Sequence, residues 1–214
     1  MSLLPQEKRE LLQRDFETRL VDPVKLVMFT QETECQYCNQ TRKLVEDMAT
    51  ITDKITAQIY DFVSDTEKVK EYGIERIPAI AVIGKQDYGV RIYGIPYGYE
   101  LQTLIEAIIN VSRGQTDLSE KTKEVVKDIK TPVNIKVFVN LTCPHCPSAA
   151  ATAHKLAIEC GNVRAEVIDA QEFPDLALKY NVIGVPKIVI NEKVEFVGEF
   201  SEDLFAEHVL LGAF

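Results

Sequence analysis

The sequence lacks a surplus of basic residues and has no apolar run at its start. Its 214 residues include 24 Lys and Arg against 33 Asp and Glu, which gives a net charge of −9, and neither half is basic. We therefore expect no nucleic-acid partner, because such partners are held by clusters of positive charge. Residues 1–14 are charged and contain no stretch that could act as a signal peptide or cross a membrane, so a cytoplasmic protein without a membrane partner is expected.

Cysteine is also sparse, with only five residues. This odd number is too small for the disulfide framework of a secreted domain, and a cytoplasmic Cys-x-x-Cys pair is more often catalytic or metal-binding. Four of the five lie in two such pairs, Cys35-Gln36-Tyr37-Cys38 and Cys143-Pro144-His145-Cys146. Each pair enters a helical pattern, where unpaired backbone N–H groups and the positive end of the helix dipole stabilise a thiolate at the first sulfur. The second sulfur can close a disulfide with the first, so the sequence predicts thiol-disulfide exchange.

The chain repeats itself. Landmarks recur in register when the second half is aligned on the first: Phe16 with Val125, Leu20 with Ile129, Pro23 with Pro132, Phe29 with Phe138, Asp61 with Asp169, Tyr72 with Tyr180, Pro78 with Pro186 and Ile80 with Ile188. This match indicates two homologous units, residues 1–116 and 117–214, divided in the polar stretch 114–119. Each unit is long enough to bury a small core of its own.

Hydrophobic patterning predicts an α/β protein. The elements expected in the first unit are helix 5–21, strand 24–29, helix 38–48, strand 55–63, helix 65–72, strands 79–83 and 90–93, and a closing helix that ends near residue 114. A strand-helix-strand segment implies a parallel pair, and the tight hairpin after each Pro implies an antiparallel one. Each unit should therefore be a mixed four-stranded sheet flanked by helices.

A strand, a Cys-x-x-Cys helix and a Pro that precedes a later strand, at the same separation in both units, resemble the thioredoxin fold in tandem. Two fused units with intact cysteine pairs resemble the protein disulfide oxidoreductases of thermophilic archaea and bacteria, also called glutaredoxin-like. The resemblance implies that Pro78 and Pro186 are cis and lie beside the disulfides. The backbone of Ile77 and Val185 would then be free to pair with an extended substrate segment. Alternatively, each Pro only begins an edge strand.

Helix position assigns the attacking thiolates to Cys35 and Cys143 and the resolving thiols to Cys38 and Cys146. The alternative is zinc, which needs four sulfurs around one ion, usually from two knuckles about 15 to 20 residues apart. Here each pair lies in its own repeat. We therefore expect no metal, and no cofactor other than the redox-active disulfides Cys35–Cys38 and Cys143–Cys146.

The residues between the cysteines differ, and we include Tyr37, Pro144 and His145 among those that support the sites. A protonated His145 would stabilise the Cys143 thiolate, whereas Glu34 opposes ionisation of Cys35. The second site is therefore expected to be the more oxidising one. Alternatively, His145 is a solvated residue with no electronic role.

Three other residues are expected to have no part in the chemistry. Cys160 has no counterpart in the first unit and is predicted to be a buried core thiol rather than a reactive one. His154 and His208 lie on helical runs and are predicted to be at the surface or the edge of the core. The strands that lead to the cysteines carry no carboxylate, so the proton acceptor of the resolving cysteine is not identified.

Two functions fit the sequence. The first is an enzyme that oxidises, reduces or isomerises protein disulfides, with thiol- or disulfide-bearing proteins as partners. The second is an electron-relay module between a flavin-dependent reductase and a peroxidase, and a thioredoxin-reductase-like flavoprotein is a candidate partner in either case. Two intact pairs favour the enzyme, because tandem relay modules keep one pair. Neither Pro hairpin is followed by the Gly-Gly with which glutaredoxins hold glutathione, which favours protein substrates.

Overall fold

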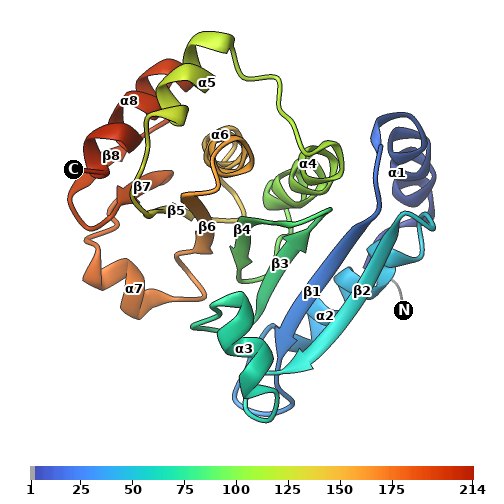
Figure 1. Ribbon diagram of the computed structural model, residues 1–214. Coiled ribbons are helices and arrows are strands. Elements are labelled where there is room, and N and C mark those ends of the chain that lie inside the picture. The colour runs from blue at the N-terminus through green and yellow to red at the C-terminus, as the bar shows by residue number, and fades with distance from the viewer. Residues whose placement is uncertain (1–2) are drawn as a thin grey trace.

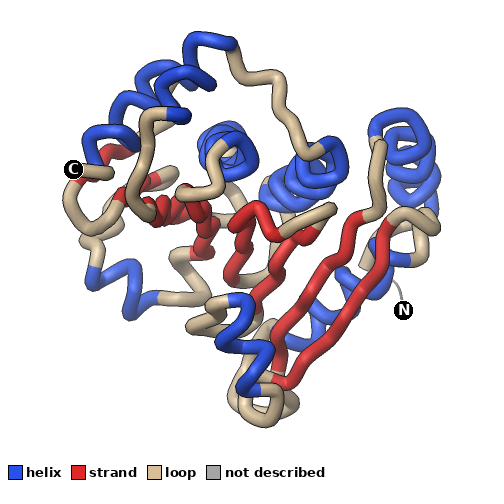
Figure 2. The backbone as a smooth tube through the Cα atoms, viewed as in Figure 1, coloured by secondary structure: helices blue, strands red, loops and turns tan. Residues whose placement is uncertain are grey.

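The computed structural model describes residues 3–214 and contains a mixed sheet with helices on both faces (Figures 1 and 2). The elements in chain order are α1 (Gln6–Arg19), β1 (Val24–Thr30), α2 (Cys38–Ala49), β2 (Ile55–Asp61), α3 (Thr66–Tyr72), β3 (Ala79–Ile83), β4 (Asp87–Tyr93), α4 (Glu100–Arg113), α5 (Glu120–Lys127), β5 (Val133–Val139), α6 (Cys146–Glu159), β6 (Val163–Asp169), α7 (Pro174–Lys179), β7 (Lys187–Ile190), β8 (Val194–Val197) and α8 (Glu202–Gly212). No helix among residues 3–214 is long and apolar enough to cross a membrane.

The two halves of the sheet have the same topology. In the first, β1 pairs in parallel with β2 and antiparallel with β3, and β3 forms a hairpin with β4. In the second, β5 pairs in parallel with β6 and antiparallel with β7, and β7 forms a hairpin with β8. Two mixed four-stranded units were predicted, and this prediction is confirmed.

The two halves join edge to edge, in the strand order β2-β1-β3-β4-β6-β5-β7-β8. Strand β4 pairs in parallel with β6, with Val90 opposite Ala165 and Tyr93 opposite Ile168. The chain therefore forms one eight-stranded sheet, which the repeat did not predict. Strands β1, β4, β5 and β6 all run in the same direction. The cysteine pairs that follow β1 and β5 therefore lie on the same side of this sheet, at the carboxyl ends of these strands.

Alternating side chains of the strands supply the cores on the two faces. Leu26 and Met28 belong to a large cluster with α1, α2, α4, α6 and α8, whereas Val27 and Phe29 face the other side with Tyr72 of α3. The large cluster runs through both halves, because α4 packs against α6 of the second half (Figure 1). The lengths of the two repeats had predicted a separate core in each unit. The division at residue 116 stays a prediction.

Candidate redox sites

The first cysteine pair lies between β1 and α2 and is closed as a disulfide, with an S–S distance of 2.01 Å. Cys38 is the first residue of α2 and is fully buried, whereas Cys35 precedes the helix and is half-buried. The Ile77–Pro78 peptide bond is cis, and both residues line the same pocket as Cys35 and Tyr37. The more accessible sulfur therefore faces the pocket, and the buried one lies behind it.

The second pair lies between β5 and α6, with an S–S distance of 2.22 Å. Cys146 begins α6, and its backbone N–H donates to Cys143 Sγ at 3.1 Å. Cys143 Sγ is also 3.8 Å from the carbonyl oxygen of Val185, which precedes Pro186 in a cis peptide bond. In the reduced pair, an N–H donor at the helix start would stabilise a thiolate at Cys143, and the assignment of Cys143 as the attacking sulfur stays a prediction.

His145 lies beside this pair but points into solvent, with 71% of its side chain exposed. Its Nδ1 is 3.2 Å from Glu199 Oε2. Ser148 Oγ donates to the other Glu199 oxygen at 2.5 Å, and this hydrogen bond is the main cause of the lowered pKa of Glu199. A positive charge on His145 would therefore lie beside the negative charge of Glu199. The carboxylate would offset the effect of the imidazolium on Cys143. Pro144, between Cys143 and His145 in the sequence, is exposed.

The remaining cysteine and histidines lie away from both disulfides. Cys160 is buried and takes part in no disulfide. His208 lies at the edge of the core against Phe196 and Phe200. His154 differs from the prediction, because it is 1% exposed on α6, and burial lowers its pKa to about 4. Because the imidazole stays neutral at ordinary pH, it can be buried where the alanine-rich helix α6 packs on the sheet.

A buried acid that was not predicted from the sequence, Glu100, lies in the first turn of α4. It is 2% exposed, and its Oε2 accepts a hydrogen bond from Thr103 Oγ1 at 2.8 Å, while its Oε1 has no partner among the described residues. Burial raises its pKa to about 7, with a further contribution from Asp169. The signal was present, since Glu100 stands four residues before Leu104 and so lies on the apolar stripe of the helix.

Glu100 lies at the same edge of the sheet as the second disulfide. Helices α4 and α6 pack together and begin where the parallel strands β4 and β5 end (Figure 1). Immediately before Glu100, the N–H of Tyr99 donates to the carbonyl of Leu141 at 3.1 Å, in the loop that delivers Cys143. The residue that carries this buried carboxyl in the first half therefore follows directly on a backbone contact to the redox loop of the second half.

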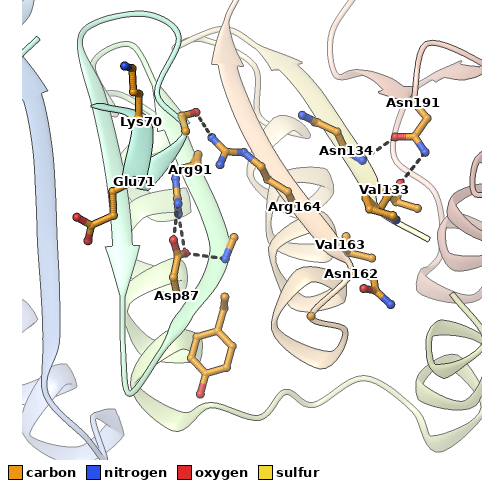
Figure 3. Close-up of a pocket in the computed structure, with 15 residues that line it drawn as sticks. Lys70, Glu71, Asp87, Arg91, Val133, Asn134, Asn162, Val163, Arg164 and Asn191 are labelled. Carbon is orange, nitrogen blue, oxygen red and sulfur yellow. Dashed lines mark hydrogen bonds and ion pairs between the residues drawn. The ribbon is translucent and has the colours of Figure 1, made fainter. Parts of the chain in front are cut away.

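A cleft of about 500 Å³ contains no cysteine and lies at the opposite edge of the sheet, where β4, β5 and β6 begin (Figure 3). The two arginines that line it, Arg91 and Arg164, already have partners. Arg91 is paired with Asp87 at 2.5 Å, and Arg164 donates to the carbonyls of Tyr72 and Gly73. These contacts hold α3 of the first half against β6 of the second, so we interpret the cleft as part of the junction. Among residues 3–214, no group of three or more His, Cys, Asp or Glu side chains could hold a metal ion.

Comparison with known proteins agrees with this geometry. The thioredoxin domain family matches residues 24–106 and 133–210. A crystal structure of a protein disulfide oxidoreductase from Aeropyrum pernix has a TM-score of 0.92 and 32% sequence identity, covering 100% of this chain and 95% of that chain. The structure of the alkylhydroperoxide reductase AhpF from Enterococcus faecalis has a TM-score of 0.87 and 26% identity, covering 96% of this chain and 99% of that chain.

A curated relative belongs to the same class as the second of these structures. The corresponding alkyl hydroperoxide reductase component of Pseudomonas aeruginosa is 29% identical over 151 residues, which are 71% of this chain and 27% of that protein. The chain thus spans about a quarter of the length of this relative and of similar curated proteins.

Proposed function

Because this chain belongs to the thioredoxin-domain family, and within it to the tandem protein disulfide oxidoreductases, we propose that it oxidises, reduces and isomerises the disulfides of substrate proteins at two sites. The observation that carries the proposal is the pair of Cys-x-x-Cys disulfides, each at a helix start and both on one edge of the sheet. Two pairs suit isomerisation, in which a wrong bond is attacked and then re-formed elsewhere.

Each exchange proceeds through a mixed disulfide. In reduction, the Cys143 thiolate attacks a substrate disulfide, bonds to one sulfur and releases the other as a thiolate. The Cys146 thiolate then attacks Cys143 Sγ, which closes the Cys143–Cys146 bond and frees the second substrate thiol. Two electrons pass to the substrate, and oxidation is the reverse sequence. Cys35 and Cys38 take the corresponding roles at the first site.

Cys146 must lose its proton before it attacks, and Glu100 is our candidate acceptor. Three observations support this role: the burial of Glu100 at the start of α4, its unpartnered Oε1, and the contact between Tyr99 and the redox loop. A carboxyl with a pKa of about 7 can both accept and return a proton near neutral pH. On this proposal, Glu100 supplies the proton acceptor at the second site. The strands that precede the cysteines contain no carboxylate that could do so.

Replacement of Pro186 by alanine is expected to lower the rate of exchange at the second site by about tenfold. Val185 O lies 3.8 Å from Cys143 Sγ, so a shift of this backbone displaces the segment on which an extended substrate would pair. The rate of oxidation of a cysteine-containing peptide, measured in a Cys35→Ser background, checks the prediction. Pro78→Ala in a Cys143→Ser background is the matching test at the first site and should lower the rate there likewise. Unchanged rates in both variants would reduce these prolines to turn formers.

A second candidate is the relay function, which the likeness to the alkylhydroperoxide reductase AhpF favours. Refolding of a scrambled disulfide protein, compared with turnover by a thioredoxin-reductase-like flavoprotein and a peroxidase, separates the two functions. We expect the chain to restore activity to the scrambled protein catalytically. Rapid transfer of electrons to the peroxidase without any refolding activity would instead establish the relay.

A further inference from the structure

The pocket at the first redox site has walls from both halves of the molecule. It has a volume of about 320 Å³. The first half contributes Glu34, Cys35, Gln36, Tyr37, Ile77 and Pro78, and the second contributes Gln171, Glu172 and Pro174. The contribution of the second half comes from the loop between β6 and α7 and from Pro174, the first residue of α7, which reach this position because β6 pairs with β4.

The junction behind this wall is tightly packed. Gly94 follows β4 with a φ of +98°, and a Cβ built there would lie 2.8 Å from Asp169 Cβ and 3.1 Å from Glu172 Oε1. The N–H of Gly94 donates to the carbonyl of Pro78 at 2.9 Å, and the next N–H, that of Ile95, donates to Glu172 Oε1 at 2.6 Å. The backbone that supports Pro78 is therefore bonded directly to the second half.

The second site provides an internal comparison. Gly198 takes the place of Gly94, since its N–H donates to the carbonyl of Pro186 at 2.8 Å and its φ is +106°. A Cβ built on Gly198, however, would meet nothing within 4 Å among the described residues. Thus the same turn is packed against the other half at the first site and open at the second.

The pocket at the first site is lined by two acids, one from each half. Glu34 and Glu172 line it, and the described residues that form its lining include no Lys, Arg or His. Glu34 is exposed, whereas Glu172 is half-buried. Burial and, to a smaller extent, the neighbouring Asp169 raise the pKa of Glu172 to about 7. The hydrogen bond that the structure gives the Glu172 carboxyl comes from the neutral Ile95 N–H. A cation from a substrate would supply a countercharge to this carboxylate.

We propose that the β6–α7 loop makes the first site selective, with Glu172 as a specificity-determining residue that favours substrate segments carrying Lys or Arg next to the reactive cysteine. The inference rests on the proposed exchange activity and adds a substrate class to one of its two sites. At the second site the corresponding turn at Gly198 is not covered by the other half, so this site should accept substrates with less regard to charge. The two sites then divide the substrates between them.

The test uses two peptides of equal length, each with one cysteine, flanked in one by lysines and in the other by glutamates. The rate at which each peptide reduces the disulfide is measured at pH 8, where Glu172 is mostly ionised. A Cys143→Ser/Cys146→Ser variant reports the first site, and a Cys35→Ser/Cys38→Ser variant reports the second. The ratio of rates at the second site corrects for the difference in thiol reactivity between the peptides.

We expect the lysine peptide to be favoured at the first site by about threefold or more beyond its ratio at the second. Glu172→Gln, which keeps an acceptor for Ile95 N–H, should remove most of this excess, as should 1 M NaCl. Glu67→Gln, an exposed acid in α3, is the matched control and should leave it unchanged. Equal ratios at the two sites, or an excess that survives Glu172→Gln, would overturn the inference. Failure of both peptides at both sites would instead refute the exchange activity.

Discussion

Substitution of Cys143 by serine is expected to remove most of the disulfide oxidase and isomerase activity, whereas Cys35→Ser removes a smaller part. Cys143 Sγ accepts the N–H of Cys146 at the start of α6, and this bond favours its thiolate. At the first site, Glu34 and Glu172 both line the pocket of Cys35 and oppose its ionisation. The second site should therefore have the lower nucleophile pKa and the more oxidising pair, on which electrons collect.

The size of this difference follows from linkage. One pKa unit corresponds to about 1.4 kcal/mol, which for a two-electron couple is about 30 mV and a factor of about 10 in the redox equilibrium. Equilibration of each single-pair variant with glutathione buffers gives the two potentials, and refolding of a scrambled protein gives the activities. Cys160→Ser is the control, because this buried thiol takes no part in either pair. Equal potentials, or a greater loss from Cys35→Ser, would contradict the ranking.

Glu100→Gln is expected to raise the free energy of unfolding at pH 8 by about 3 kcal/mol. Burial raises the pKa of Glu100 from 4.5 to about 7, so the folded state binds this proton more tightly than the unfolded state. The resulting stabilisation is fully present below about pH 4.5 and is lost as the pH rises through about 7. Above that pH the wild type holds a buried carboxylate, which the neutral glutamine avoids.

Urea unfolding of the oxidised protein at pH 5 and pH 8 measures this effect as a difference between the variant and the wild type. The difference should grow with pH. Glu172, whose pKa is also raised to about 7, and His154, whose pKa is lowered to about 4 and which acts in the opposite direction, are common to both proteins and cancel. Stability differences that are equal at the two pH values would show that Glu100 is ionised normally.

The same variant reports on chemistry. If Glu100 accepts the Cys146 proton, Glu100→Gln slows resolution, and the mixed disulfide at Cys143 accumulates during turnover. Trapping this intermediate by acid quench and mass spectrometry measures its lifetime. If Glu100→Gln is more stable than the wild type but resolves the mixed disulfide at the wild-type rate, Glu100 is not the proton acceptor. Its effect would then be on stability alone.

Local features of the sequence were enough to predict the four cysteines of the two disulfides and the order of the elements. Two short-range patterns carried these predictions: a Cys-x-x-Cys pair at a helix start, and a Pro before β3 or β7. Each pattern occurs once in each of the two repeats. The mixed sheet of each half follows from connection lengths alone. These parts of the molecule are determined by interactions within one unit.

What the sequence did not predict arises between the units. The pairing of β4 with β6 depends on two strand edges that no local pattern matches to each other. Glu172 lines the pocket of Cys35, and Tyr99, the residue before Glu100, contacts the loop of Cys143, because this pairing brings the two halves together. Glu100 was at least detectable as a charge on an apolar helix face, whereas Glu172 precedes a short helix in an ordinary polar loop.

The pairing of β4 with β6 also bears on how the chain avoids aggregation. A strand at the edge of a sheet exposes unpaired N–H and C=O groups, which can recruit a strand of another molecule. Either half alone would leave one of these two strands open, and α4 would lose the helix that covers its apolar surface. The covalent link holds each edge close to its intended partner, so that pairing within the chain outcompetes pairing with a neighbour. In the sheet that residues 3–214 form, β2 and the four-residue β8 are left as the outer edges.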